Sequence, residues 1–211
     1  IKFNNKVEDV KFTNRKDLFN LFNKGPVTPD HVIRIKSEPL IIPNKHLSSS
    51  KMISNHINAY IKKYKNYFKK YKKNITNSKI ADPLPRIIIL EGIGFLSIGL
   101  NKKEMQVSYD IFDAMKKVII KANLVSKFKS INNTDIFKME YWPLERAKLN
   151  NQNTKKFNGN VAVITGGAGK IGSAIANKFI NENIEVILLD KNFKNLDQNI
   201  KKKCLCIECD L

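Results

Sequence analysis

The clearest hydrophobic pattern of the chain lies near its C-terminal end. An apolar, β-branched run at residues 161–165 leads into a glycine-rich turn and then into a helix-like segment, residues 173–180. A second apolar run, residues 184–189, ends at Asp190. A strand that feeds a helix through such a turn is typical of a phosphate-binding helix N-terminus. The pattern predicts a strand, a turn, a helix and a second strand, as at the start of a doubly wound parallel sheet.

The rest of the chain predicts a mixture of helices and strands. Residues 1–24 are polar and lysine-rich, and Leu18, Leu21 and Phe22 among them predict the end of a helix. Apolar residues recur at steps of three and four over residues 49–75, with lysines on the other faces, which predicts one long amphipathic helix. After a proline-rich breaker, the pattern predicts strands at residues 86–90 and 95–98, joined as a hairpin, and a helix over residues 102–122.

A short polar segment in the first half of the chain has two interpretations. Thr28 is placed to cap a helical turn that has Pro29 at its first position, and Asp30 favours the positive end of that helix. Alternatively, Asp30, His31 and Arg34 form a polar cluster that faces a substrate. The sequence favours the capping interpretation.

The charge of the chain is strongly basic. Among its 211 residues, 38 are Lys or Arg and 19 are Asp or Glu, for a formal net charge of +19. Such a charge invites a nucleic-acid interpretation. Nearly all of these cations are scattered lysines, whereas arginine is the usual residue for bidentate phosphate and base contacts. We therefore expect no nucleic-acid partner, and we interpret the apolar stripe of residues 49–75 as a core-facing side rather than as a surface for membranes or acidic partners.

Cysteine usage and hydropathy bear on the compartment. Cys204, Cys206 and Cys209 crowd one short stretch, without the second pair or nearby histidine that would complete four metal ligands. Free, buried thiols in a reducing compartment are the better interpretation. No run of about 18 apolar residues is present to span a membrane. The sequence therefore predicts a soluble, cytoplasmic protein without a membrane partner.

The glycine-rich turn has the spacing of a dinucleotide site. Gly167 is expected to permit the tight turn, Gly169 to let backbone approach a pyrophosphate, and Gly172 to let the helix pack closely. Asp190 lies 18 residues after Gly172 (190 minus 172), near the spacing of about 20 for an acid that accepts ribose hydroxyls. Its charge would repel a 2′-phosphate, so NAD is favoured over NADP, although Lys170 nearby weakens the preference. A tight turn without a ligand is the alternative.

Residues 158–172 resemble the opening of a short-chain dehydrogenase/reductase. The common pattern of that family is Thr-Gly-x-x-x-Gly-x-Gly, and Lys170 stands where its middle glycine is expected; read as Thr-Gly-x-x-Gly-x-x-Gly, the same residues fit the extended members. The segment 209–211 resembles the one after the third strand of the family, which contacts adenine. The cofactor-binding residues that the motif and the resemblance indicate are Gly166, Gly167, Gly169, Lys170, Ile171, Gly172, Asp190, Asp210 and Leu211.

Four upstream segments extend the resemblance. Residues 25–34, 85–90, 92–95 and 140–149 are similar to successive landmarks of the bifunctional aldolase/short-chain dehydrogenase proteins, whose named member joins a rhamnulose-1-phosphate aldolase to an alcohol dehydrogenase. The implied fold class is α/β. The implied domains are the C-terminal part of a class II aldolase-type region at residues 1–150, a linker at 151–157, and the first half of a Rossmann NAD-binding domain at 158–211.

This resemblance also implies chemistry that the chain does not carry. Class II aldolases hold a divalent metal, usually zinc, with three histidines, but His31, His46 and His56 form no His-x-His pair. We therefore assign no metal ligand and expect the metal only in a missing aldolase part. The Tyr-x-x-x-Lys proton relay of the reductases is absent and would lie beyond Leu211, so no catalytic residue is assigned.

The sequence thus predicts a fragment of a two-function carbohydrate enzyme. The expected substrates of the full protein are a sugar phosphate and a small aldehyde or alcohol, and a homo-oligomer is expected. The 211-residue chain alone is expected to be inactive. Two alternatives stay open: another short-chain reductase fused to a noncatalytic domain, and a basic module that binds nucleic acid or membrane surfaces.

Overall fold

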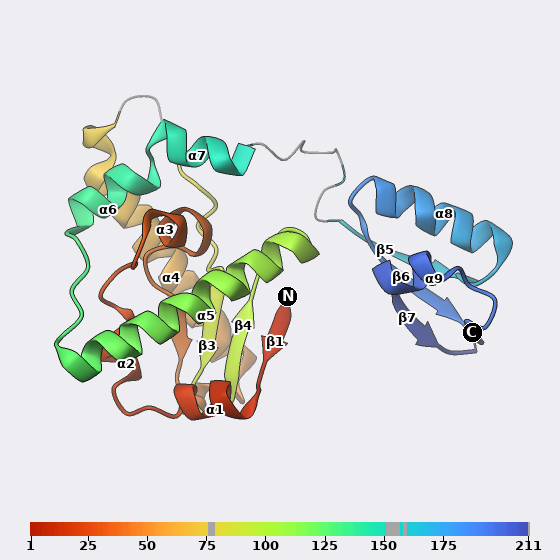
Figure 1. Cartoon of the computed structure of the whole chain (residues 1–211), viewed down its shortest axis with the longest axis horizontal. Coiled ribbons are helices and arrows are strands. Elements are labelled where there is room, and N and C mark those ends of the chain that lie inside the picture. Colours follow the sequence, from red (N-terminus) through yellow and green to blue (C-terminus); the bar gives the residue numbers. More distant parts are fainter. Residues whose placement is uncertain (76–78, 151–156, 158–159, 211) are drawn as a thin grey trace. The chain divides into compact units, whose positions relative to one another are not determined.

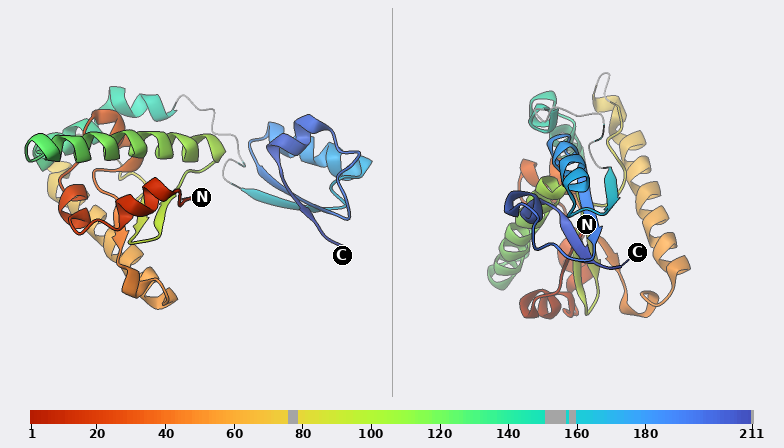
Figure 2. Two further views of the ribbon diagram at one scale, coloured as in Figure 1. Left: turned by 60° about the horizontal axis from the view of Figure 1, so that its bottom comes forward. Right: turned by 90° about the vertical axis from the view of Figure 1, so that its right-hand side faces the viewer.

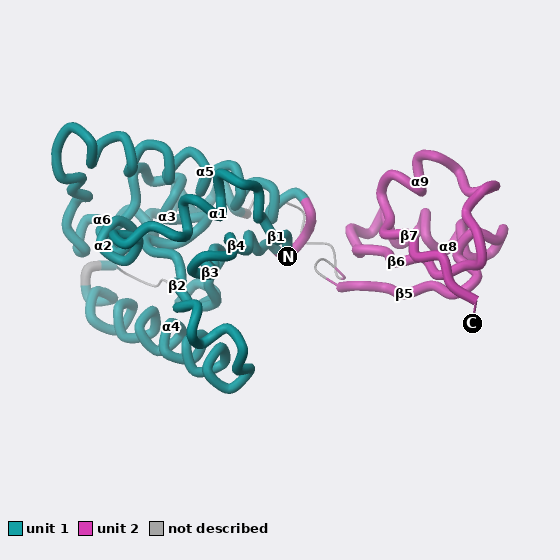
Figure 3. Tube along the Cα trace, turned by 90° about the horizontal axis from the view of Figure 1, so that it is seen from below, with its two compact units in different colours: residues 1–99, 103–151 teal, residues 100–102, 152–211 magenta. Residues whose placement is uncertain are grey.

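The chain folds into two compact units, each of which combines helices with strands (Figures 1 and 3). The computed structural model describes residues 1–75, 79–150, 157 and 160–210. Unit 1 comprises residues 1–99 and 103–151, and unit 2 comprises residues 100–102 and 152–211. Both units contain parallel strand pairs, so the chain is a mixed α/β protein. Of the predicted linker only Phe157 is described, and Leu211 lies outside the described residues.

Unit 1 is built on a four-stranded sheet with the order β1-β4-β3-β2. Its strands are β1 (Lys2–Asn4), β2 (Leu40–Ile42), β3 (Ile87–Leu90) and β4 (Gly94–Ser97). The predicted hairpin is confirmed, because β3 and β4 pair antiparallel; β2 adds to β3 in parallel and β1 to β4 antiparallel. Gly94 has a φ of 144°, and a Cβ there would lie 2.3 Å from the Asn4 carbonyl oxygen, so a glycine is needed for β1 to approach.

Helices cover both faces of this sheet (Figure 2). Alternation along β3 sends Ile87 and Ile89 into a core with Phe12, Phe22 and Phe112, and sends Ile88 toward the other face. The helices of unit 1 are α1 (Val7–Thr13), α2 (Leu18–Phe22), α3 (Pro29–Ile35), α4 (Ser50–Tyr71), α5 (Lys102–Val125), α6 (Asn133–Glu140) and α7 (Pro143–Asn150), with 3-10 turns at Asn44–His46 and Lys72–Asn74.

The long amphipathic helix predicted over residues 49–75 is confirmed as α4 and the 3-10 turn that follows it. Ser49 caps α4, since its hydroxyl accepts a hydrogen bond from the Met52 amide at 3.3 Å. Ile53 and Ile57 pack with Ile88 of the sheet, and farther along the helix Tyr64 and Phe68 are buried. The apolar stripe therefore faces the core, as expected. No helix among the described residues is long and apolar enough to cross a membrane.

Two expectations for the ends of the chain are wrong in part. The helix end expected at Leu18, Leu21 and Phe22 is confirmed as that of α2. The polar residues before it were not expected to hold further elements, but they form β1 and α1, because pairing with β4 fixes the first residues as a strand. Cys204, Cys206 and Cys209 are free, but they are half-buried rather than buried. They lie in or next to β7, which is an edge strand of a three-stranded sheet.

Unit 2 is a three-stranded parallel sheet with the order β5-β6-β7. Its elements are β5 (Val161–Thr165), α8 (Lys170–Asn181), β6 (Glu185–Asp190), α9 (Gln198–Lys203) and β7 (Leu205–Glu208). The predicted strand, turn, helix and strand are all present, with the helix beginning at Lys170, three residues earlier than expected. Ala176 of α8 packs with Val186 and Leu188 of β6, which holds the helix on the sheet.

Candidate functional site

The turn between β5 and α8 owes its shape to its glycines. Gly166 has a φ of 64°, a conformation that favours glycine. The sequence assigned the tight turn to Gly167, whereas the positive φ lies one residue earlier, at Gly166. At Gly167 the requirement is steric, because a Cβ would lie 2.7 Å from the Leu188 Cβ. The two glycines therefore bend the chain and lay the turn directly on β6.

The third glycine lets the helix approach the turn. A Cβ on Gly172 would lie 2.2 Å from the Gly166 carbonyl oxygen, and Gly172 is buried. Gly169, at the N-cap of α8, is exposed, and a Cβ there would meet only the Gly166 carbonyl oxygen at 3.3 Å. Gly172 is thus required by packing, whereas Gly169 leaves an open stretch of backbone at the helix start.

The start of α8 presents unpaired backbone donors. The first helical bond runs from the Ser173 amide to the Gly169 carbonyl at 2.9 Å. The amides of Lys170, Ile171 and Gly172 precede it and have no carbonyl partner within the helix. With the partial positive charge of the helix N-terminus, these amides can bind an anion. Lys170 and Ile171 are exposed beside them.

Asp190, the last residue of β6, contacts this turn directly. Its Oδ2 accepts a hydrogen bond from the Ala168 amide at 2.8 Å, and its Oδ1 accepts one from the Lys191 amide at 2.7 Å. Each carboxylate oxygen has a second lone pair, so both can accept a further hydrogen bond. The structure therefore gives Asp190 a bracing contact that the sequence did not predict, and it leaves acceptor capacity for a hydroxyl.

The ends of β6 and β7 lie beside each other. The Cys209 amide donates to the Asp190 carbonyl at 2.9 Å, and the exposed Asp210 carboxylate lies 3.1 Å from the Lys191 ammonium. The structure thus gathers the glycine turn, Asp190 and Asp210 at the carboxyl edge of one parallel sheet. Ligands of open α/β sheets bind at this edge.

The polar segment of α3 does not form one outward-facing cluster. Pro29 begins the helix as predicted, but the Thr28 side chain makes no capping hydrogen bond. Asp30 is exposed and pairs with Lys148 of α7 at 3.5 Å. His31 is buried, its Nδ1 has no hydrogen-bond partner, and burial lowers its pKa. Asp30 and His31 therefore face different surroundings.

The histidines do not fit the three-histidine zinc site of class II aldolases. His46 Nδ1 and His56 Nε2 share a hydrogen bond of 2.8 Å, whereas His31 is buried on α3. Within residues 1–75, 79–150, 157 and 160–210, no three His, Cys, Asp or Glu side chains gather where they could hold a metal ion. We derive no metal-dependent step from this chain.

A second polar cluster, in unit 1, was missed by the sequence analysis. Lys36, Tyr64 and Glu140 meet inside the unit, and the pKa of Lys36 is lowered to about 8 by burial. A weak signal was available, because Tyr64 and the three other tyrosines of residues 60–71 share the helical face of the apolar stripe. Nothing local indicated that Lys36 or Glu140 would be buried.

The chain is similar to a known protein family and to a bacterial protein. Residues 1–149 match the family described as aldolase class II, second domain. The protein of Bacillus subtilis (strain 168) named uncharacterized oxidoreductase YuxG is 30% identical over 191 residues, which is 88% of this chain and 27% of that protein. The chain therefore spans about a quarter of the length of this relative. No solved structure matches the chain significantly.

Proposed function

The chain belongs to the family of the second domain of class II aldolases, and we propose that its protein is a carbohydrate enzyme with two functions. In this proposal residues 1–150 are the end of an aldolase-type region that acts on a sugar phosphate. Residues 158–211 begin an NAD-dependent short-chain dehydrogenase that oxidises a small alcohol or reduces a small aldehyde.

The relative from Bacillus subtilis supports the second half of the proposal. Its name describes an oxidoreductase, and the match covers 88% of this chain, which is more than residues 1–149 alone provide. The resemblance therefore continues into the segment that contains the glycine turn. Because the chain spans only 27% of that relative, the activity of the whole protein rests on the proposal.

The observation that carries the proposal is the hydrogen bond between the glycine turn and Asp190, which holds the two beside each other. The free amides at the start of α8 would bind the pyrophosphate, with Gly169 leaving room for it. Asp190, held by the Ala168 amide, would accept hydrogen bonds from the ribose hydroxyls. A carboxylate at this position disfavours a 2′-phosphate, so we propose NAD rather than NADP. Asp210 and Leu211 would lie near the adenine.

Each part of this site has a limited task. A nicotinamide cofactor supplies hydride transfer when it is bound, and the residues of the turn bind and orient it. Lys170, exposed at the helix start, adds a positive charge beside the phosphates.

Isothermal titration calorimetry of the 211-residue chain with NAD and with NADP tests the proposal. We expect saturable NAD binding that is lost in Gly169→Val, because a branched side chain would fill the approach to the phosphates. The matched control is Ala174→Val, at an exposed position of α8. No saturable binding of either nucleotide by the folded chain, or equal loss in both variants, would overturn the proposal.

A further inference from the structure

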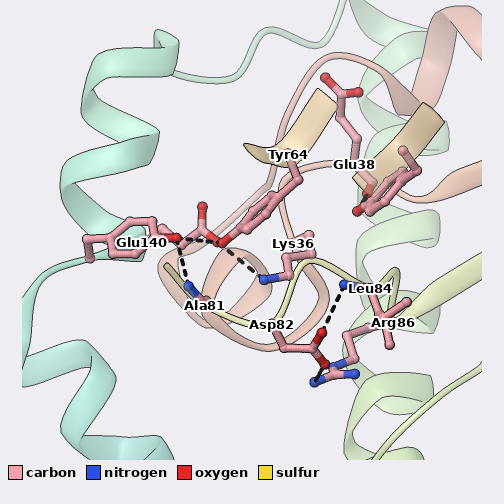
Figure 4. Close-up of polar contacts among 10 residues, drawn as sticks. Lys36, Glu38, Tyr64, Ala81, Asp82, Leu84, Arg86 and Glu140 are labelled. Carbon is pink, nitrogen blue, oxygen red and sulfur yellow. Dashed lines mark hydrogen bonds and ion pairs between the residues drawn. The ribbon is translucent and has the colours of Figure 1, made fainter. Parts of the chain in front are cut away.

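Tyr64, in the middle of α4, is held by residues at the end of α6 and by the residue that follows α3 (Figure 4). Its hydroxyl group donates a hydrogen bond of 2.6 Å to Glu140 Oε1 and lies 2.8 Å from the Tyr141 hydroxyl. The Lys36 ammonium lies 4.0 Å from the centroid of the Tyr64 ring and 3.7 Å from Glu140 Oε1. Lys36 is 7% exposed and Glu140 is 2% exposed, so contacts shielded from water fix the orientation of the Tyr64 ring.

The surroundings of Tyr64 are more polar than packing alone requires. Removing the charges of Lys36 and Glu140 from water offsets much of their mutual attraction. The backbone of Lys36 is in the left-handed region, with a φ of 70°. Within the described part of the chain, the buried Glu140 Oε2 and Tyr67 hydroxyl have no hydrogen-bond partner. Strained backbone and unsatisfied buried groups concentrate at functional sites, which directs attention to the cavity that Tyr64 and Tyr67 line.

One wall of this cavity is aromatic. Four tyrosines of α4 line it, Tyr60, Tyr64, Tyr67 and Tyr71. The ring centroids of Tyr64 and Tyr67 lie 5.9 Å apart and those of Tyr67 and Tyr71 lie 5.4 Å apart, so neighbouring rings contact one another. Aromatic side chains arranged in this way offer flat surfaces on which a nucleobase stacks.

The size of the cavity limits the ligand. Its volume of about 350 Å³ lies at the lower end of the range of roughly 300–1,000 Å³ that small-molecule sites occupy. A site of this size suits one base with one sugar and one phosphate better than it suits a dinucleotide.

Two exposed lysines of α4, Lys63 and Lys70, also line the cavity. Lys63 pairs with the carboxylate of Glu38, whose carbonyl accepts a hydrogen bond of 2.9 Å from the Tyr60 hydroxyl. The Lys70 ammonium lies 5.2 Å from the centroid of the Tyr71 ring. Both ammonium groups are thus positioned by other cavity residues, and they offer charge-assisted hydrogen bonds to a phosphate.

Two asparagines complete the lining and bear on the choice of base. Asn66 comes from α4 and Asn133 from the start of α6. A side-chain amide presents an acceptor beside its donors, which matches the N6 amino group and the N7 acceptor of adenine. Guanine presents two acceptors at the same edge, O6 and N7, so one amide cannot pair with both in this way.

We propose that this cavity of unit 1 is an effector site for an adenine mononucleotide, with the base against the tyrosines of α4 and the phosphate at Lys63 and Lys70. The site shares no residue with the glycine turn of unit 2. Its ligand is neither the substrate proposed for the aldolase-type region nor the dinucleotide proposed for the turn. The inference therefore goes beyond the proposed function and does not depend on it.

Calorimetric titration of the full 211-residue chain tests this inference. The chain carries Gly169→Val, so that the glycine turn contributes no nucleotide binding, and the ligands are adenosine 5′-monophosphate (AMP), adenosine, ribose 5-phosphate and guanosine 5′-monophosphate (GMP). We expect AMP to bind at least about tenfold more tightly than each of the other three. Adenosine lacks the phosphate, ribose 5-phosphate lacks the base, and GMP presents the wrong base edge.

Variants of the lining lysines separate the phosphate contact from the base contact. The double variant Lys63→Met and Lys70→Met should weaken AMP binding by about tenfold or more and leave adenosine binding unchanged. Lys62 and Lys69 precede these lysines on α4, are exposed and do not line the cavity. The double variant Lys62→Met and Lys69→Met changes the net charge equally and should bind AMP with unchanged affinity.

Three results would overturn the inference. Equal weakening by both double variants would show general attraction of an anion to a basic helix. Binding of ribose 5-phosphate as tight as that of AMP would show that the base contacts nothing. Absence of AMP binding in the Gly169→Val chain would leave the cavity without its ligand.

The two proposals fail separately in this design. A wild-type chain that binds NAD, with a Gly169→Val chain that does not bind AMP, rejects the cavity alone. AMP binding in the Gly169→Val chain, with no NAD binding at the glycine turn of the wild type, rejects the dinucleotide site alone.

Discussion

Asp190 accepts a hydrogen bond of 2.8 Å from the Ala168 amide, which ties the end of β6 to the glycine turn. Its other carboxylate oxygen accepts from the Lys191 amide at 2.7 Å. Two backbone donors thus hold the carboxylate in one orientation at the carboxyl edge of the sheet. One residue thereby braces the turn and presents a negative charge where we propose the ribose of the cofactor to lie.

The charge of Asp190 should set the choice between NAD and NADP. Asp190→Asn keeps an oxygen for the Ala168 amide but removes the charge that would repel a 2′-phosphate. We expect the preference for NAD over NADP, measured as the ratio of the two Kd values by calorimetry, to fall by about tenfold, which corresponds to about 1.4 kcal/mol. Glu182→Gln, at the far end of α8, is the charge-matched control. An unchanged ratio in Asp190→Asn would contradict the proposed position of the ribose.

Two glycines of the turn should respond differently to one added methyl group. In Gly172→Ala the new Cβ would meet the Gly166 carbonyl oxygen at 2.2 Å, so we expect the free energy of unfolding of unit 2 to fall by about 1–3 kcal/mol. In Gly169→Ala the closest atom is at 3.3 Å, and the change should stay within about 0.5 kcal/mol. Hydrogen exchange of peptides from residues 160–190 measures the change in stability in each of the two variants. Equal loss of protection would mean that Gly172 is not packed as described.

Much of the fold could be predicted because its signals are local. The α4 stripe repeats over six turns of helix, and the strand, turn and helix at residues 161–181 carry both an apolar run and glycines. The carboxyl edge that gathers the turn and Asp190 follows from the parallel order of the strands. Which of the adjacent glycines Gly166 and Gly167 has a positive φ is not encoded locally, since glycine tolerates that conformation at either position.

What the sequence could not predict depends on contacts between distant residues. Strand β1 is only three residues long and exists by pairing with β4, with Lys2 opposite Ser97. Glu140 meets Tyr64 across 76 positions and Lys36 across a larger separation. No window of sequence around Lys36 or Glu140 indicates burial, because charged residues are ordinarily exposed. The buried contacts among Lys36, Tyr64 and Glu140 therefore become visible only when α3, α4 and α6 are packed together.

Lys116 on α5 should be important for the stability of unit 1. Its ammonium lies 2.8 Å from Asp9 and 2.9 Å from Asp113, and Asp9 is 3% exposed. Lys116→Met leaves Asp9 buried without its partner, so we expect the free energy of unfolding to fall by about 3–5 kcal/mol. Urea denaturation followed by the fluorescence of Trp142 measures this change.

The neighbouring lysine provides the control for Lys116. Lys117 also pairs with Asp113, but its side chain is 64% exposed, and Lys117→Met should change stability by less than about 1 kcal/mol. Adding Asp9→Asn to Lys116→Met should restore part of the loss, because it removes the unpaired charge. A loss of the same size in the Lys116 and Lys117 variants would contradict a buried ion pair at Asp9.

The stability of unit 1 should depend on pH through Lys36. Burial lowers the pKa of this lysine from 10.5 to about 8, against the raising effect of Glu140. Between these two values the unfolded chain binds more protons at this position than the folded chain does. The free energy of unfolding therefore rises with pH across that window. Loss of contact with water raises the pKa values of Tyr60, Tyr64 and Tyr67, which acts in the opposite direction above about pH 10.

Lys36→Met should remove this pH dependence. From pH 7.5 to 9.5 we expect the free energy of unfolding to rise by about 1–2 kcal/mol more in the wild type than in the variant. This expectation holds whatever the difference in stability between the two proteins at pH 7.5. Urea denaturation at four or five pH values, followed by the fluorescence of Trp142, gives the two slopes. Lys69→Met, an exposed change of the same kind on α4, should keep the wild-type slope. If Lys36→Met also keeps that slope, the ammonium of Lys36 titrates as it would in water, and the burial of Lys36 beside Glu140 is refuted.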